Sequence, residues 1–312
     1  MTPAEIQAAA GRIRGRVLRT PVRYSGWLSE ASGGEVFLKL ETLQPTFSYK
    51  IRGATNAVLR LAAESPGTSI VTASAGNHGR AMAHAARAAG IPLVVYAPED
   101  APRTKLDAIR ALGAELHCCR DFDDAERQAK AHAGRHNATF VSPYAHPNVI
   151  AGAGTTGLEI LEDLPDVDVI VVSVGGGGLI SGVAIATEGR TETAGVEVAA
   201  STPFTTSLAA GRITQIEVGQ TLADGVSGNL DPETPTFDIV RERVRRIAVI
   251  PEDELISAMR EAAHHERLIV EGAAAVALAG IATRKLDLEG RKVAVVVSGA
   301  NIDLDKWAKL VA

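Results

Sequence analysis

The chain is predicted to fold as an α/β protein with two open, mostly parallel, twisted sheets flanked by helices. Two observations predict this class. Short β-branched runs alternate along the sequence with Ala-rich stretches that carry apolar residues at three- and four-residue spacing, and this alternation is typical of parallel sheets covered on both faces. The length of 312 residues corresponds to about two domains.

The individual elements follow from the two periodicities. Short runs rich in β-branched residues are predicted to be strands. They are Val36–Leu40, Ser69–Thr72, Leu93–Tyr96, Glu115–Cys118, Thr139–Val141, Val167–Val174, Gly195–Ala199, Arg246–Val249 and Lys292–Val297. Stretches with an apolar stripe are predicted to be helices. They are Ile51–Ala63, Gly79–Ala89, Lys105–Leu112, Asp123–His136, Gly154–Asp163, Glu252–Glu266 and Gly272–Ala282.

A smaller sheet is predicted inside a larger one. The consecutive β-α units between Ile51 and Ser142 can form a compact open sheet of their own. Residues 51–146 are therefore expected to be a small inserted domain, and residues 1–50 and 147–312 a large domain. Ligands of open parallel sheets bind beyond the carboxyl ends of the strands, so the residues that follow each strand are the candidates for function.

The composition argues against nucleic-acid binding and membrane association. The net charge is −5 without a basic stripe, and aromatic residues make up only 4% of the chain, so phosphate contacts and stacking platforms are scarce. Residues 169–187 are uncharged and long enough to suggest a membrane span. Four consecutive glycines interrupt them, however, and a strand followed by a helix explains the pattern better.

The cysteines and the N-terminus favour a cytoplasmic location. Cys118 and Cys119 are adjacent and are the only cysteines, so an ordinary disulfide between them is geometrically unfavourable. Residues 1–18 contain several arginines but no continuous apolar region, so no signal peptide is expected.

Lys50 is the first candidate for chemistry. It lies within Phe47–Gly53, at the predicted start of a helix, among aromatic, hydroxyl and small residues. Apolar surroundings lower the pKa of a lysine, and the neutral amine is the form that attacks carbonyl carbons and forms Schiff bases. The alternative is that Lys50 only solvates the first turn of its helix.

Three loops that follow strands offer polar or small groups. The loop after Ser69–Thr72 contains Ser74 and Asn77 before a helix, and its backbone N–H groups are predicted to face an anion, although an ordinary capped turn is the alternative. The loop after Val167–Val174 begins with Gly175 to Gly178 and favours phosphate, the alternative being a flexible corner. The third loop begins with Ser298, a neutral hydroxyl at the end of a strand, where a plain turn is also plausible.

Two other patterns are weaker. Residues 152–157 match the glycine spacing of a dinucleotide loop, but no strand runs directly into them and the next strand ends in glycines rather than an acidic residue. His264 and His265 are adjacent on a helix and so face different directions, which makes them poor joint metal ligands. No metal site is predicted.

A reactive lysine, an anion loop, a glycine phosphate loop and a terminal hydroxyl together suit pyridoxal phosphate. Across nearly its whole length the chain resembles the fold type II (tryptophan synthase beta-like) pyridoxal phosphate enzymes, within them the serine/threonine dehydratase (threonine ammonia-lyase) and serine racemase group. The matching segments are Ser48–Ala54, Ser74–Gly79, Val149–Gly152, Gly157–Glu159, Gly175–Leu179, Thr221–Gly225 and Ser298–Asn301.

The resemblance implies a role for each candidate residue. Lys50 binds the cofactor covalently, Tyr49 packs near it, Asn77 contacts its ring hydroxyl and Ser298 contacts its ring nitrogen. The phosphate is held by Gly175, Gly176, Gly177, Gly178 and Leu179, and the substrate carboxylate by Ser74, Ala75, Gly76, Asn77 and His78. The large domain then binds the cofactor, the small domain binds the substrate, and the protein is a homodimer.

The reaction expected from these residues is β-elimination. A serine hydroxyl at Ser298, unlike a carboxylate, does not hold the ring nitrogen protonated, so the ring is a weaker electron sink and early loss of a β-substituent is favoured. In the implied mechanism Lys50 takes the α-proton, and L-threonine, L-serine or a close relative yields a 2-oxo acid and ammonia. Ala75 replaces the serine that serves related racemases as a second proton carrier, so negligible racemase activity is expected.

Departures from the group leave alternatives open. Glu197 matches one residue of a metal site found in part of the group, but Pro203 stands where an aspartate is needed, so dependence on magnesium is doubtful. Phe47 and Ala145 replace small or polar residues near the cofactor, which leaves bulkier substrates such as hydroxyaspartate or phenylserine possible. Serine racemase, β-replacement and a noncatalytic small-molecule-binding protein are the remaining alternatives.

Overall fold

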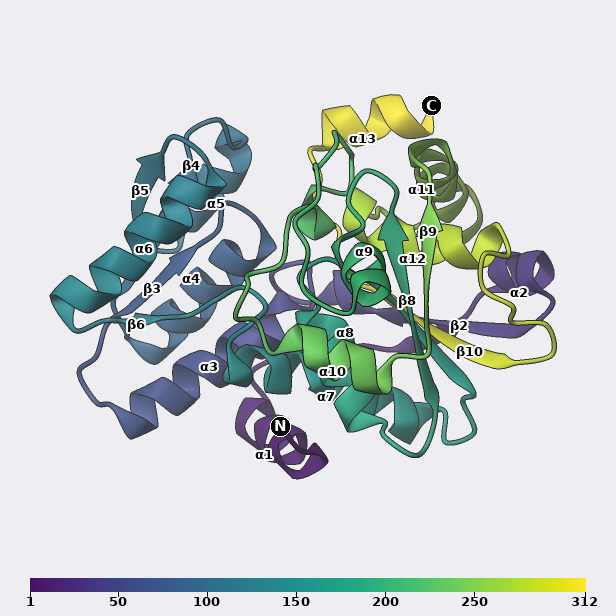
Figure 1. Cartoon of the computed structure of the whole chain (residues 1–312), viewed down its shortest axis with the longest axis horizontal. Coiled ribbons are helices and arrows are strands. Elements are labelled where there is room, and N and C mark those ends of the chain that lie inside the picture. Colours follow the sequence, from purple (N-terminus) through teal and green to yellow (C-terminus); the bar gives the residue numbers. More distant parts are fainter.

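The structure, a computed structural model, describes all residues from 1 to 312 and contains a larger and a smaller sheet (Figure 1). The larger sheet has six strands in the order β1-β2-β10-β7-β8-β9. Its pairs are parallel except for β1, which runs antiparallel to β2. The strands are β1 (Val22–Tyr24), β2 (Glu35–Leu40), β7 (Val169–Ser173), β8 (Glu192–Val198), β9 (Arg246–Ile250) and β10 (Lys292–Val297).

Alternating side chains of the larger sheet supply two cores. Val169, Val171 and Val295 face one way and pack with α2 (Gly26–Ser32), α11 (Glu252–Glu266) and α12 (Gly272–Ala282). Ile170 and Val172 face the other way, toward α7 (Pro147–Asp163), α8 (Gly178–Ala186) and α10 (Thr236–Arg243). Strands buried on both faces need apolar residues at every position, which explains the continuous β-branched runs. The remaining helices of this part are α1 (Pro3–Ile13), α9 (Pro203–Ala210) and α13 (Leu304–Val311), with the short 3-10 turns η1 (Glu41–Leu43) and η2 (Asp224–Val226).

The smaller sheet has four parallel strands in the order β5-β4-β3-β6, drawn at the left of Figure 1. They are β3 (Ile70–Ala73), β4 (Leu93–Pro98), β5 (Glu115–Cys119) and β6 (Thr139–Phe140). Ile70 and Val95 pack on the side of α3 (Lys50–Glu64) and α4 (Asn77–Ala89), whereas Val71 and Val94 pack against α6 (Phe122–His136). α5 (Arg103–Ala111) covers part of the first side through Ile109.

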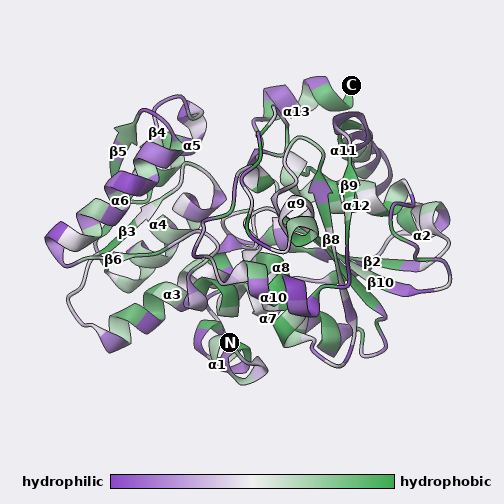
Figure 2. Cartoon of the chain, in the orientation of Figure 1, coloured by the Kyte–Doolittle hydropathy of each residue, from purple (hydrophilic) through white to green (hydrophobic).

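Hydropathy follows these layers. Figure 2 shows hydrophobic residues concentrated in the central strands and in α8, and hydrophilic residues along α6 and α10. No helix is both long and apolar enough to span a bilayer.

The predicted fold class is confirmed, and most predicted elements match within a few residues. α11, α12 and β10 have the predicted bounds. α7 begins at Pro147 rather than at Gly154, because the His146 side chain caps the helix and accepts a hydrogen bond from the Asn148 N–H. The strand and helix expected within residues 169–187 are β7 and α8, whereas β1, α1, α2, α9, α10 and α13 carry no prediction.

The glycines within α7 are explained by close packing. A Cβ on Gly152 would lie 2.5 Å from the Arg52 carbonyl oxygen, and one on Gly154 would lie 2.6 Å from the Gly182 carbonyl oxygen. Glycine therefore lets α7 approach both α3 and α8. The dinucleotide-like spacing of residues 152–157 lies inside a helix and forms no nucleotide loop.

A buried ionic network fixes the start of α3 to the larger sheet. Arg52 and Glu41 are fully buried, and Arg52 Nε donates to Glu41 Oε2 at 2.8 Å. Arg52 Nη1 also donates to Glu159 on α7 at 2.7 Å, and Lys39 Nζ on β2 donates to the same carboxylate at 2.6 Å. Buried charges are tolerated only when they are paired in this way.

Removing Arg52 should destabilise the fold strongly. Arg52→Met leaves the Glu41 carboxylate buried without its cation, and we expect a loss of about 3–5 kcal/mol in the free energy of unfolding. Chemical denaturation of the cofactor-free protein measures it. The control is Arg60→Met on the same helix, whose exposed pair with Glu64 should contribute less than about 1 kcal/mol. Equal effects of the two substitutions would contradict this account.

Candidate active site

Lys50 is the first residue of α3, and the segment before it is held against the loop after β10. An isolated antiparallel bridge pairs Ser48 with Gly299. The Tyr49 N–H donates to the Ser298 carbonyl at 3.0 Å, and the Ala300 N–H donates to the Phe47 carbonyl at 2.9 Å. The predicted lysine and the predicted terminal serine are thus brought together by backbone pairing.

The Lys50 amine faces the segment after β6. Its Nζ donates to the Pro143 carbonyl at 2.8 Å. Burial lowers the pKa of Lys50 to about 8, although the nearby Glu271 carboxylate opposes the shift. Roughly a tenth of the amine is therefore neutral at pH 7, far more than for a solvated lysine, and the neutral form is the one that nucleophilic lysine chemistry requires.

The glycine loop lies between β7 and α8 and is closely surrounded. Gly177 has φ +83°, and a Cβ on Gly176 would lie 2.3 Å from the Tyr144 Cγ. The Thr236 hydroxyl, at the start of α10, donates to the Gly176 carbonyl at 2.9 Å and so fixes the loop to that helix. The first backbone N–H groups of a helix have no intrahelical acceptor, so the start of α8 favours an anion. Only glycine fits this cradle.

Tyr144 is a site residue that the sequence did not reveal. Its ring lies against Gly176, and its hydroxyl accepts a hydrogen bond from the Asp231 N–H at 2.9 Å. Because Pro143, the preceding residue, accepts from Lys50, this segment joins the lysine to the glycine loop. A tyrosine shortly before a helix carries no sequence signal for such a role.

The Ser74–His78 segment leads from β3 into α4. The Gly76 N–H donates to the Ser74 hydroxyl at 3.2 Å, and α4 begins at Asn77. His78 is buried, and neither of its ring nitrogens has a hydrogen-bond partner. Burial, followed by the charge of Lys50, holds the pKa of His78 well below its usual value, so the ring is neutral.

Glu271 joins Asn77 to the loop after β10, and the sequence did not predict this role either. The Asn77 Nδ2 donates to Glu271 Oε1 at 2.7 Å, and the Asn301 N–H donates to Glu271 Oε2 at 2.9 Å. A Cβ on Gly299 would lie 2.5 Å from Glu271 Oε1, so this glycine makes room for the carboxylate. Burial, with Asp224 next, raises the pKa of Glu271 to about 7. The available signal was an acidic residue immediately before the apolar helix α12.

The comparisons with known proteins agree with this chemistry. The family model described as pyridoxal-phosphate dependent enzyme matches residues 13–299. The chain belongs to this family. Its relatives include the L-threonine ammonia-lyase of Thermotoga maritima, which is 41% identical over 100% of this chain and 78% of that protein. The L-threo-3-hydroxyaspartate ammonia-lyase of Saccharomyces cerevisiae is 35% identical over 100% of this chain and 96% of that protein.

Solved structures of family members are similar over nearly the whole chain. The serine racemase of Dictyostelium discoideum superposes with a TM-score of 0.90 at 33% identity, covering 97% of this chain and 99% of that one. The processed form of threonine deaminase isoform 2 from Solanum lycopersicum superposes with a TM-score of 0.90 at 31% identity, covering 98% of this chain and 90% of that one. The predicted resemblance to fold type II enzymes is thereby confirmed.

The residues present fit the cofactor of the family. Lys50 supplies an amine with a lowered pKa, and the glycine loop is packed too closely for side chains and leads with its backbone into the start of α8. The buried Ser48 hydroxyl lacks a protein partner, which suits a polar group bound nearby. The individual residue roles remain predictions.

Glu197 is engaged within the protein. It is fully buried and accepts hydrogen bonds from the Phe204 N–H at 2.8 Å and the Thr205 N–H at 2.9 Å. The Thr205 hydroxyl also donates to it at 2.6 Å. Both carboxylate oxygens therefore cap the start of α9, where Pro203 is the first residue. No group of three His, Cys, Asp or Glu side chains is arranged to hold a metal ion.

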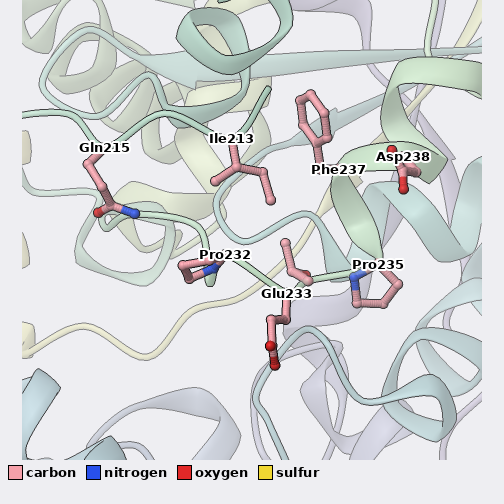
Figure 3. A pocket seen from close by; sticks show the side chains of 8 residues that line it. Ile213, Gln215, Pro232, Glu233, Pro235, Phe237 and Asp238 are labelled. Carbon is pink, nitrogen blue, oxygen red and sulfur yellow. The ribbon is translucent and has the colours of Figure 1, made fainter. Parts of the chain in front are cut away.

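One open cavity lies apart from these residues. It has a volume of about 640 Å³ and is lined by Ile213, Gln215, Pro232, Glu233, Thr234, Pro235, Phe237 and Asp238 (Figure 3). It contains neither a lysine nor a helix start occupied by glycines, so we place the chemistry at Lys50. Thr236 lies between the two regions and contacts the glycine loop from the cavity side.

Cofactor uptake should depend on pH through Lys50. Because only the neutral amine attacks the aldehyde of pyridoxal phosphate, uptake by the cofactor-free protein should accelerate as the pH rises through about 8. Growth of the visible absorbance band after mixing measures the rate. Lys50→Ala should form no such band at any pH. A rate that still rises at a pH near 10.5 would show that Lys50 titrates like a solvated lysine.

Proposed function

We propose that this protein is a pyridoxal phosphate-dependent dehydratase (ammonia-lyase) that converts a β-hydroxy amino acid to a 2-oxo acid and ammonia by β-elimination. L-Threonine, L-serine or a close relative is the substrate. The observation that carries the proposal is the pairing of a low-pKa Lys50 with the Ser298 segment, since a neutral hydroxyl at the ring nitrogen favours elimination. The names of the Thermotoga and yeast relatives, both ammonia-lyases, support it.

Each part of the site has a proposed task. The bound cofactor withdraws electrons from the α-carbon of the substrate. Lys50 takes the α-proton as its neutral amine. The start of α4, with Ser74, Ala75, Gly76, Asn77 and His78, holds the substrate carboxylate through backbone N–H groups and the helix dipole. Gly175 to Leu179 hold the phosphate at the start of α8.

Elimination is favoured over racemisation. Inversion at the α-carbon requires a second proton carrier on the opposite face of the substrate, and the side chain of Ala75 carries no exchangeable proton. The neighbouring His78 is buried with a strongly lowered pKa, so it is a poor replacement. These features support a lyase with negligible racemase activity.

The wider organisation is proposed on the same basis. Residues 51–146, which contain the whole smaller sheet, would be the substrate-binding domain, and residues 1–50 and 147–312 the cofactor-binding domain. We propose a cytoplasmic homodimer that binds no nucleic acid. The homodimer rests on the family resemblance, and the net charge of −5 disfavours nucleic acid.

Keto-acid release tests the proposal. Serine, threonine, hydroxyaspartate and phenylserine are supplied separately to the cofactor-loaded protein, and at least one should yield a 2-oxo acid and ammonia. Lys50→Ala should reduce the rate by about 10³-fold or more, because the proton carrier is lost. Lys285→Ala is the matched control and should leave the rate unchanged, since the Lys285 side chain is 44% exposed and pairs only with Glu254.

The same reactions distinguish the alternatives. Chiral analysis of the remaining serine should find no D-serine, and inversion at a rate comparable to elimination would identify a racemase. A protein that retains no cofactor and turns over none of the four substrates would refute the enzyme assignment.

A further inference from the structure

Arg80 lies one turn into α4, outside the groups assigned above, and makes two specific contacts. Its Nη1 donates to the Asn301 Oδ1 at 2.7 Å. Its guanidinium carbon lies 5.1 Å from the centre of the Phe47 ring. The side chain is thus held at the junction between α4, the segment before Lys50 and the loop after β10.

The contacts with Arg80 and with the Thr46 carbonyl agree on which way the Asn301 amide faces. A guanidinium only donates hydrogen bonds, so the atom of Asn301 that faces it must be the oxygen. The NH₂ group then faces the other way and donates to the Thr46 carbonyl at 2.8 Å and to the Asn77 Oδ1 at 2.7 Å. Every hydrogen of that amide is used.

The same logic continues to Asn77. Because its oxygen accepts from Asn301, its NH₂ group faces Glu271 and donates to Oε1 at 2.7 Å. An amide nitrogen carries two hydrogens, so a second N–H remains. Asn301 and Glu271 therefore together hold the Asn77 amide with its oxygen toward Asn301 and its NH₂ group toward Glu271.

Phe47 contributes to the placement of Arg80. Its φ of +57° is in the left-handed region that favours glycine, yet the position carries a large aromatic side chain that is about half exposed. The backbone is held there by hydrogen bonds from Phe47 N–H to the Gln44 carbonyl at 2.7 Å and from Ala300 N–H to the Phe47 carbonyl at 2.9 Å. The ring lies within cation–π distance of the guanidinium, which favours this position of the Arg80 side chain.

We propose that Arg80 is a positioning residue that acts through Asn301 and reinforces the orientation in which Asn77 presents its remaining N–H to the ring hydroxyl of pyridoxal phosphate. This inference rests on the proposed function, in which Asn77 contacts that hydroxyl. A donated N–H stabilises the ionised ring oxygen, so Arg80 lowers the pH at which the bound cofactor loses this proton. Arg80 itself contacts neither cofactor nor substrate.

The test compares Arg80→Gln, Arg80→Lys and the control Arg87→Gln, which changes an exposed arginine on the same helix. Glutamine is uncharged and either donates or accepts, so it loses the charge-assisted hydrogen bond that holds the Asn301 oxygen, whereas lysine is charged and only donates. We expect Arg80→Gln to weaken cofactor binding by about 3- to 10-fold, the effect of one hydrogen bond, and to raise the midpoint of the pH titration of the visible band. In Arg80→Lys, cofactor affinity and titration midpoint should both lie close to the wild-type values. Arg87→Gln should match the wild type in both.

Combining Arg80→Gln with Asn301→Ala separates the positioning role of Arg80 from a merely structural one. In an Asn301→Ala protein the chain from Arg80 to Asn77 is already broken, so adding Arg80→Gln should change neither the cofactor affinity nor the titration midpoint further. Effects of Arg80→Gln that persist unchanged in that background would overturn the inference. The inference would also be overturned if the Arg80→Gln protein had the same titration midpoint and the same cofactor affinity as the wild type. A wild-type protein without any visible band would instead refute the proposed function itself.

Discussion

The site depends on the backbone pairing between residues 46–50 and the loop after β10. The Ser48–Gly299 bridge and the Tyr49–Ser298 hydrogen bond join two segments that are far apart in the sequence. This pairing places the lysine helix directly beyond the carboxyl end of the central strand β10. Its geometry is reinforced within the same turn of α3, where the fully buried Arg52 is paired with Glu41 and Glu159. Lys50 therefore has a fixed position without contributing to the packing itself.

Around that fixed lysine, each loop is connected to the next by a specific contact. Pro143 accepts from Lys50, Tyr144 packs on the glycine loop, and Glu271 receives hydrogen bonds from both Asn77 and Asn301. The smaller sheet contributes Asn77 after β3 and the Pro143–Tyr144 segment after β6, whereas the glycine loop and the loop after β10 follow strands of the larger sheet. The chemistry thus arises where the ends of two separate sheets meet, so neither sheet alone carries a complete site.

The sequence predicted the parts of this arrangement that have a local signal. The β10 strand and the helices α11 and α12 follow from periodicity, and the glycine loop is visible because four consecutive glycines are costly unless they are needed. Glu271 and Asn77 are 194 residues apart, and their contact has no local signature. The roles of Tyr144 and Arg80 likewise depend on partners in other elements, which the sequence around them does not indicate. The early start of α7 depended on a histidine cap, which is a less common capping residue than serine or aspartate.

Covalent attachment of the cofactor to Lys50 is the step on which the proposed function depends. Borohydride reduction of the cofactor-loaded protein fixes the bond permanently, and mass spectrometry of its peptides then locates the added pyridoxyl group. We predict that the group is found on the peptide containing Lys50 and on no other. A group located on another lysine, such as the buried Lys39, or a protein that remains unmodified, would contradict the account.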